Sequence, residues 1–181
     1  MNLDAIRGLA QPDQRSCGPS SLVAAHILLD PAYAATQNPH AFAGTVKELH
    51  RQLTGASAFG RSQLPWPRAL GTPPWAVARA MSAYAGIPYR TRIVRWGSRK
   101  DDFDRLSAAV AAGHPCPLYV GDRIPRHVVL AVAPTDAGVD VYNPGRGTVA
   151  ELERAAFETG KLTTFGRWTR PWFAVLPKGD G

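Results

Sequence analysis

The sequence of 181 residues has few cysteines and no long apolar run, and these shortages exclude several classes of protein. Its two cysteines, Cys17 and Cys116, could form one disulfide, but they cannot staple a small scaffold and they form no cluster at zinc spacing. No apolar run approaches the roughly 20 residues that span a membrane, and the first ten residues lack the features of a signal peptide. We therefore expect no metal, no cofactor and no membrane insertion. The protein should be cytoplasmic, or exported by a route that needs no signal peptide.

Long runs of one charge are also missing. The formal net charge is +7 and comes mainly from arginine, but the basic residues are spread along the chain and form no run of five or six. No nucleic-acid-binding motif is present, so we interpret the charge as a solvated surface and expect no nucleic-acid partner. The few lysines are Lys47, Lys100, Lys161 and Lys178.

The remaining composition is that of a folded domain. Hydrophobic residues make up 45% and charged residues 19%, which is typical of globular proteins. The length fits one domain with its own core, and no repeat divides the chain, so we predict a single domain over 1–181.

The order of the expected elements predicts an α+β fold, with helices first and an antiparallel sheet after them. Pro19 suits the first turn of a helix, and the apolar run behind it supports that start. The elements predicted for the first two thirds are a helix over 18–29, a helix that a Thr45/Glu48 capping box opens and Gly55 ends, a loop over 56–71, a helix from Thr72-Pro73 to Gly86, a strand over 87–94, and a helix from a cap at Asp101 or Asp102 to Gly113. The elements predicted for the last third are strands over 117–120, 127–134 and 139–143, a tight turn over 143–147, a short helix over 151–158 and a final strand over 172–177.

Cys17 is the candidate nucleophile. It stands directly before the first predicted helix, where free N–H groups and the helix dipole favour a thiolate. A buried structural cysteine rarely stands in a polar segment such as DQRSCGPSS, whereas Cys116 enters a strand and fits that structural role.

A cysteine nucleophile needs an imidazole base from elsewhere in the chain, and five histidines compete for the role. His127 begins a predicted strand and can present its side chain at the end of the sheet, which makes it the candidate. The others are interpreted as packing, surface, cap or turn residues: His26, His40, His50 and His114.

Asn143 is the candidate group that orients the imidazole. In the strand VDVYN, side chains alternate, so Val139, Val141 and Asn143 share one face while Asp140 and Tyr142 share the other. If the valines face the core, Asn143 points inward and Asp140 points to solvent. Asparagine is also common in turns such as Asn-Pro-Gly, and the two roles are compatible.

Acyl transfer also needs donors that stabilise the oxyanion. The backbone N–H of Cys17 can supply one, and the side-chain amide of Gln11 can supply another. Gln14 is a rival for the second role.

These residues together resemble the papain-like cysteine peptidase superfamily, and within it the bacteriocin-processing, double-glycine leader peptidase group. The group's pattern is Q-x5-C-G, later H-[FY/V]-V-V-L, then D-P-x-x-G about sixteen residues after the histidine. The matching segments here are Gln11 with Cys17-Gly18, His127-Val128-Val129-Leu130, Asn143-Pro144-Gly145, and the G-x-P-x-x-x-x-V strand from Gly113 to Val120.

The resemblance covers most of the chain. It implies a papain-like α+β fold in which the nucleophile's helix packs on a C-terminal antiparallel sheet. It also implies a Cys17–His127–Asn143 triad with Gln11 in the oxyanion hole. Asn143 stands where the group has Asp, although papain itself uses Asn, and residues 31–100 form an expanded region that prevents a transfer of substrate preference. No ATP-binding or membrane part is present, so a stand-alone form is expected.

Three functions remain open at this stage. The first is a peptidase acting on a peptide or protein substrate. The second is a bacterial effector or toxin that uses the same residues as a glutamine deamidase or transglutaminase, for which an inhibitor or immunity protein is a possible partner. The third is a peptide-binding module without catalysis.

Overall fold

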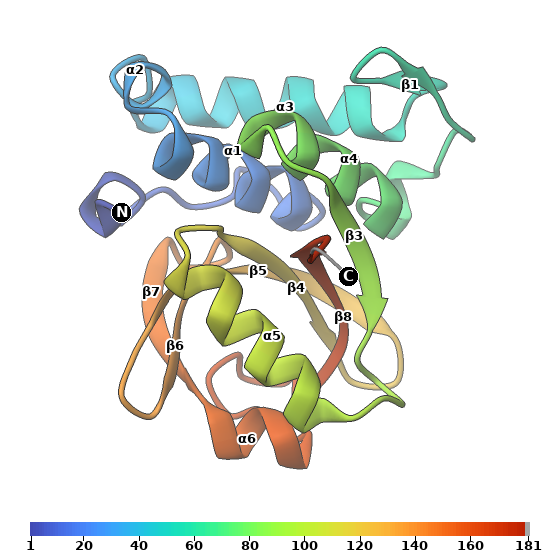
Figure 1. The fold of residues 1–181 in the computed structure, drawn as a ribbon. Coiled ribbons are helices and arrows are strands. Elements are labelled where there is room, and N and C mark those ends of the chain that lie inside the picture. Colours follow the sequence, from blue (N-terminus) through green and yellow to red (C-terminus); the bar gives the residue numbers. More distant parts are fainter. Residues whose placement is uncertain (180–181) are drawn as a thin grey trace.

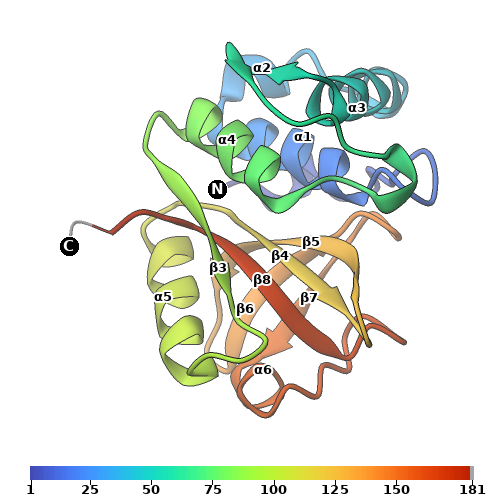
Figure 2. The same cartoon turned by 90° about the vertical axis from the view of Figure 1, so that its right-hand side faces the viewer.

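The structure is a computed structural model that describes residues 1–179, and within them a layer of helices lies over a curved antiparallel sheet (Figures 1 and 2). The helical layer comes from the first half of the chain. It consists of the 3₁₀ turn η1 (Leu3–Ala5), α1 (Cys17–Leu29), α2 (Pro31–Ala34), α3 (Pro39–Thr54), the 3₁₀ turn η2 (Arg68–Leu70) and α4 (Pro74–Ala85). The α+β architecture predicted from the sequence is confirmed.

The sheet has the strand order β3-β8-β4-β5-β6-β7, and all neighbours are antiparallel. Its central strands β4 and β5 are almost wholly buried, because α1 packs against β5 and α5 covers the sheet as well (Figure 1). The strands and remaining helices are β3 (Tyr89–Ile93), α5 (Arg99–Ala111), β4 (Cys116–Gly121), β5 (Pro125–Pro134), β6 (Gly138–Asn143), β7 (Thr148–Glu153), α6 (Arg154–Thr159) and β8 (Arg170–Pro177).

The predicted start of the second long helix is wrong. Helix α3 begins at Pro39, because the side chain of Asn38 accepts hydrogen bonds from the N–H groups of the first turn and Pro39 suits the first helical position. Thr45 and Glu48 therefore lie inside the helix and form no capping box. The predicted end at Gly55 is confirmed.

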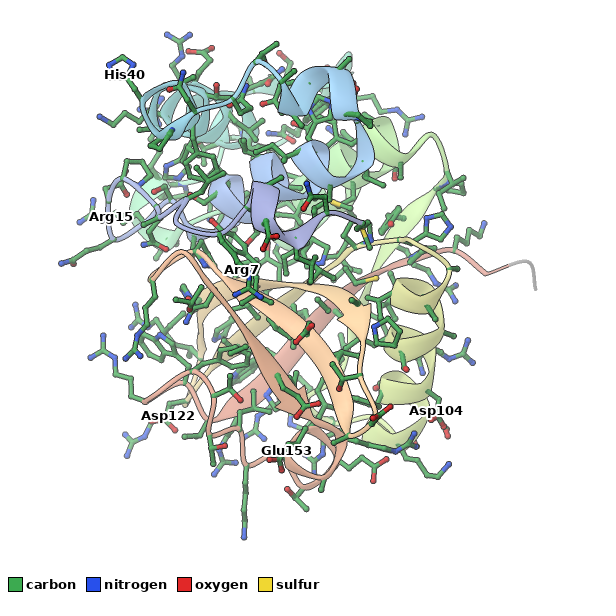
Figure 3. The ribbon with its side chains drawn as sticks, turned by 90° about the vertical axis from the view of Figure 1, so that its left-hand side faces the viewer. Arg7, Arg15, His40, Asp104, Asp122 and Glu153 are labelled. Carbon is green, nitrogen blue, oxygen red and sulfur yellow. The ribbon has the colours of Figure 1, made fainter. Side chains whose placement is uncertain are left out.

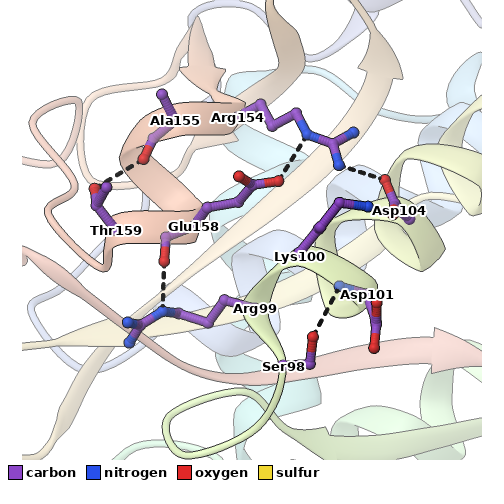
Figure 4. Close-up of polar contacts among 9 residues, drawn as sticks. All are labelled: Ser98, Arg99, Lys100, Asp101, Asp104, Arg154, Ala155, Glu158 and Thr159. Carbon is purple, nitrogen blue, oxygen red and sulfur yellow. Dashed lines mark hydrogen bonds and ion pairs between the residues drawn. The ribbon is translucent and has the colours of Figure 1, made fainter.

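The predicted cap of α5 is also wrong. Ser98 is the N-cap, and its Oγ accepts a hydrogen bond of 3.4 Å from the N–H of Asp101, as Figure 4 shows. Asp102 lies in the first turn but is fully buried and forms an ion pair with Arg92 of β3, so its carboxylate does not cap the helix.

Helix α6 is held to α5 by an ion pair and a hydrogen bond (Figure 4). Arg154 contacts Asp104 of α5 at 2.7 Å and Glu158 of its own helix at 2.7 Å. The Nε of Arg99 donates to the carbonyl oxygen of Glu158 at 2.7 Å. These contacts fix α6 beside α5 at the end of the sheet remote from α1.

The short helix predicted over 151–158 is only partly correct. Residues 148–153 form β7, which pairs with β6, and the helix begins at Arg154. The strand alternates as strands do, since Leu152 is buried while Glu151 and Glu153 are exposed. The sequence contains this alternation, but the helix-favouring residues that follow it predict a helix that starts too early.

The segment predicted as an ordered loop over 56–71 is irregular apart from η2 and a small hairpin whose strands have two residues each. The hairpin pairs β1 (Ser57–Ala58) with β2 (Arg61–Ser62). Gln63 ties the segment to the end of α3, because its Nε2 donates to the carbonyl oxygens of Leu53 and Gly55 at 2.7 and 3.0 Å. Among the described residues, no helix is both long and apolar enough to cross a membrane.

Candidate active site

Cys17 is the first residue of α1, as the sequence predicts, and its side chain is 6% exposed. The N-cap, Ser16, gives the helix no side-chain cap, because its Oγ donates to the carbonyl oxygen of Asp13 at 3.2 Å. The amide N–H groups of Cys17 and Gly18 therefore face the sulfur, where they lower the pKa of the thiol. This end of the helix provides hydrogen-bond donors beside the sulfur.

The glycine after the cysteine is required by a neighbour from the expanded region. A Cβ built on Gly18 would lie 2.8 Å from the Oγ1 and 2.9 Å from the Cβ of Thr72. Such distances are shorter than real contacts, so Thr72 leaves room only for glycine there. The carbonyl oxygen of Thr72 accepts a hydrogen bond of 2.8 Å from the Tyr119 hydroxyl of β4, which fixes it against the sheet.

His127 lies near the start of β5 and is 9% exposed. Its Nε2 lies 2.9 Å from the Oδ1 of Asn143, the last residue of β6. The same Oδ1 accepts a hydrogen bond of 3.0 Å from the N–H of Gly145. An oxygen cannot donate, so Nε2 carries the proton in this bond and Nδ1 of a neutral imidazole has the free lone pair.

The turn after β6 holds Asn143 in place. A Cβ added to Gly145 would lie 3.2 Å from the Asn143 Oδ1 and 3.5 Å from the His127 Cε1, so this residue covers the histidine–asparagine pair closely. The other residues of β6 follow the predicted alternation in part. Val141 is buried as expected, but Tyr142 on the other face is buried too, because its hydroxyl donates to the carbonyl oxygen of Leu9.

The cysteine and the histidine strand are joined through the residue next to His127. The backbone N–H of Val128 is one of the groups that lower the pKa of Cys17, so it lies at the sulfur. The carbonyl oxygen of Val128 accepts a hydrogen bond of 3.3 Å from the hydroxyl of Ser21, one turn further along α1. The start of α1 is thus fixed against the start of β5.

The protonation states of the two side chains differ from the sequence expectation. Burial is the largest effect on Cys17 and raises the pKa of its thiol, although the surrounding N–H groups lower it. Burial also lowers the pKa of His127, against the hydrogen bond to Asn143, which raises it. Both shifts favour a neutral thiol beside a neutral imidazole, whereas the helix dipole alone predicts a thiolate.

Gln11 reaches the same region from the N-terminal segment. Its backbone N–H donates to the carbonyl oxygen of Pro144, the residue after Asn143, at 2.8 Å, and its Nε2 donates to the carbonyl oxygen of Asp13 at 2.6 Å. Its Oε1 is buried and has no hydrogen-bond partner among residues 1–179. Gln14, the rival for this role, is exposed and lines a surface pocket that contains none of Gln11, Cys17 and His127.

The remaining histidines and the second cysteine lie elsewhere. His26 is stacked between two tyrosine rings, at 3.7 and 4.3 Å, which agrees with the packing role predicted for it. His50 is only 8% exposed, so the surface or cap role predicted for it is wrong. Both cysteines are free, and the thiol of Cys116 is buried in β4 and donates to the carbonyl oxygen of His114 at 3.2 Å.

Comparison with known proteins gives structural matches only. No protein-family model and no curated protein matches the chain. Among solved structures, the chain is similar to the peptidase domain of Streptococcus ComA, a bifunctional ABC transporter involved in a quorum-sensing pathway. The TM-score is 0.49 and the identity 16%, over 96% of this chain and 99% of that one.

It is also similar to a double-glycine motif protease from an AMS/PCAT transporter, solved in complex with its leader peptide. That comparison has a TM-score of 0.49 and 15% identity, and it covers 93% of this chain and 89% of the other. One of these structures is thus described as a peptidase domain and the other as a double-glycine motif protease.

Proposed function

We propose that this protein is a cysteine peptidase that works through an acyl-enzyme, with Cys17 as nucleophile and His127 as base. The observation that carries the proposal is the hydrogen bond between His127 and Asn143, on a strand whose next residue contacts the Cys17 sulfur. A base oriented by a third group, next to a thiol at a helix N-terminus, is the arrangement that thiol acyl transfer needs.

The first step is attack on the peptide carbonyl. The Cys17 sulfur forms a bond to the carbonyl carbon while Nδ1 of His127 takes the thiol proton and the carbonyl π electrons move to oxygen. Because burial holds both groups neutral at rest, the proton moves as the substrate is attacked, and no stored thiolate is needed.

Two donors are available for the oxyanion. The N–H of Cys17 lies at the sulfur, and Nε2 of Gln11 has a second hydrogen beyond the one that it gives to Asp13. Fixed donors stabilise the tetrahedral intermediate because they need no rearrangement as charge develops. We assign the oxyanion hole to Gln11 and to the backbone of Cys17.

The second half of the cycle returns the enzyme. The protonated His127 gives its proton to the leaving nitrogen as the carbon–nitrogen bond breaks, which leaves a thioester on Cys17. Water then attacks the thioester with His127 again as base, and the thiol leaves with the proton. Asn143 keeps the imidazole oriented in both halves, and being neutral it does so without adding a charge to the buried site.

The test is cleavage of a defined library of synthetic peptides, read by mass spectrometry. The wild-type protein should cleave a subset of them, and Cys17→Ala should cleave none while it keeps the same circular dichroism spectrum and unfolding midpoint. Cys116→Ala is the matched control, since it removes the other thiol, and it should retain cleavage. Cleavage by folded Cys17→Ala would refute the mechanism.

The same experiment examines the alternative functions. A deamidase would leave the peptides intact and convert glutamine side chains to glutamates, which changes their mass, and a transglutaminase would join them to an added amine. A binding module would change none of them. No contact in the described residues favours these alternatives over main-chain cleavage.

A further inference from the structure

A positively charged pocket of about 510 Å³ lies next to the loop that leads to Cys17. Its walls come from that loop, from one face of α3 and from η2, so segments far apart in the sequence build it. The lining residues are Asp13, Gln14, Arg15, Lys47, His50 and Arg68.

The pocket adjoins the segments that hold the active site, although none of the proposed catalytic residues lines it. The carbonyl oxygen of Asp13 accepts hydrogen bonds from Gln11 and Ser16, the residues on either side of the loop that ends at Cys17. On the other side, the chain runs from Arg68 through Gly71 to Thr72, which packs on Gly18. Any group bound in the pocket is therefore within reach of a substrate lying over Cys17.

The cations of the pocket have no anionic partner. None of Arg15, Lys47 and Arg68 forms an ion pair within residues 1–179, whereas Arg51 of the same helix α3 pairs with Glu48 at 2.6 Å. Figure 3 shows Arg15 projecting from the edge of the helical layer into solvent. The one carboxylate in the lining, that of Asp13, already accepts a hydrogen bond of 2.8 Å from the backbone N–H of Arg15.

A second feature points to a missing ligand. His50 lines the pocket, is 8% exposed, and its buried Nε2 has no hydrogen-bond partner among the described residues. Buried polar groups normally have partners, and in the tautomer that carries its proton on Nε2 this imidazole would donate to an anionic oxygen, which the three cations without ion pairs would also attract.

We propose that this pocket binds an acidic side chain of the substrate, so that the peptides cleaved carry Asp or Glu near the scissile bond. The proposal rests on the peptidase function proposed above and names its substrate class. Asp13 lies four positions before Cys17, so the loop spans at most about 14 Å, and an extended peptide covers that length in about four residues. The acidic residue is thus expected within about four positions of the cleaved bond. A nucleic acid would meet the same charges, but it has no peptide bond for Cys17 to cleave.

The closing experiment compares pairs of peptides that differ only by Glu or Gln at one position. Wild-type protein should cleave the Glu member of a pair with a kcat/KM at least tenfold higher, at a position within about four residues of the cleaved bond. In Lys47→Met/Arg68→Met that ratio should fall about tenfold.

The matched control removes the same two charges elsewhere. Arg90 on β3 and Arg105 on α5 are exposed, form no ion pair among residues 1–179 and line a separate pocket. Arg90→Met/Arg105→Met should keep the Glu/Gln ratio of the wild type. An equal fall in both double variants would assign the preference to net charge and overturn the proposal.

Failure of this inference is distinguishable from failure of the peptidase function. Cleavage without an acidic preference, or with one that Lys47→Met/Arg68→Met retains, refutes the pocket's role and leaves the peptidase standing. If wild-type protein cleaves nothing, the peptidase proposal fails, and alkylation of Cys17 by anionic iodoacetate relative to neutral iodoacetamide tests the pocket alone.

In that case, the ratio of the iodoacetate rate to the iodoacetamide rate is compared between variants. A ratio that is several-fold lower in Lys47→Met/Arg68→Met, but not in Arg90→Met/Arg105→Met, supports an anion site next to Cys17. An unchanged ratio overturns the proposal. If a single-stranded oligonucleotide slows the iodoacetate reaction more strongly than a Glu-rich peptide does, the proposal is also overturned, and the pocket is assigned to nucleic acid instead.

Discussion

Replacing Asn143 by alanine should reduce catalysis far more than replacing Asp140, which lies three residues earlier on β6. Asn143→Ala removes the acceptor of the His127 Nε2–H bond, which is 2.9 Å long and partly buried. Without it, the imidazole can turn and can move its proton to Nδ1, the atom that the mechanism needs free. Asp140 makes no side-chain hydrogen bond or ion pair among the described residues, and it lies opposite Glu151 of β7.

The size of the effect follows from the bond that is lost. A buried donor left without a partner costs about 1–3 kcal/mol. Each 1.36 kcal/mol corresponds to a tenfold change in rate, so kcat/KM should fall roughly 5- to 150-fold if the whole loss appears in the transition state. Asp140→Ala should change stability and rate by about 0.5 kcal/mol or less, a factor of about two.

The assay is kcat/KM on one peptide that the wild type cleaves, with the unfolding midpoint of each variant as control. Asn143→Asp restores the acceptor and adds a charge that favours the protonated imidazole, so it should recover activity and move the acidic limb of the pH profile upward. Equal losses in the two alanine variants, or the reverse ranking, would refute the assignment of Asn143 as the orienting residue.

The remaining predictions use the same proteins. Because burial raises the pKa of the Cys17 thiol, its rate of alkylation by iodoacetamide should be low at neutral pH and should increase only above the pH at which ordinary thiols ionise. Cys116 is more fully buried and should need a still higher pH, and mass spectrometry locates the alkylated cysteine. Burial lowers the pKa of His127, so the base stays neutral above about 6.5 and activity should fall only as pH drops below that value; an acidic limb above it would contradict the shift. Gly18→Ala should lower the free energy of unfolding by about 1–3 kcal/mol through overpacking on Thr72, and Thr72→Gly in the same chain should restore most of it in urea titrations.

Much of the fold could be predicted because its signals are local. The helix that starts at Cys17 follows from Pro19 and the apolar run behind it, and the hairpin follows from the apolar run of β5, the turn TDAG and the alternation of side chains along β6. The alternation along β6 predicts that Asn143 points inward, and the structure places its side chain within hydrogen-bond distance of His127.

The missed features depend on contacts between distant segments. Nothing near Gly18 indicates that Thr72 would press on it, and the burial of His50 depends on a loop and a turn that come from other parts of the chain. The raised pKa of the Cys17 thiol could not be predicted for the same reason, since the helix N-terminus is visible in the sequence while the desolvation that outweighs it is not.

The segments around the site are joined to one another in a ring of contacts: the N-terminal segment, α1, β5 and the turn after β6. The N-terminal segment is bound to the turn after β6 by backbone hydrogen bonds of 2.8 Å, from Gly8 to Gly147 and from Gln11 to Pro144. Gly147 adopts a φ of +64° with that segment packed against it, which any larger residue would disturb. The same segment leads through the loop to Cys17, whose helix is fixed to β5, and β5 returns to the turn through His127 and Asn143.

A closed circuit of this kind makes its members interdependent. Substitutions in Gln11, Cys17 and Asn143 should therefore give combined effects smaller than the sum of the single ones, because breaking one link already loosens the others. The first ten residues carry none of the reacting groups, yet they supply the Gly8 bond to Gly147 and the Leu9 carbonyl oxygen that accepts from Tyr142. Their loss should therefore lower kcat/KM, although every catalytic side chain and the bond from Gln11 to Pro144 would still be present.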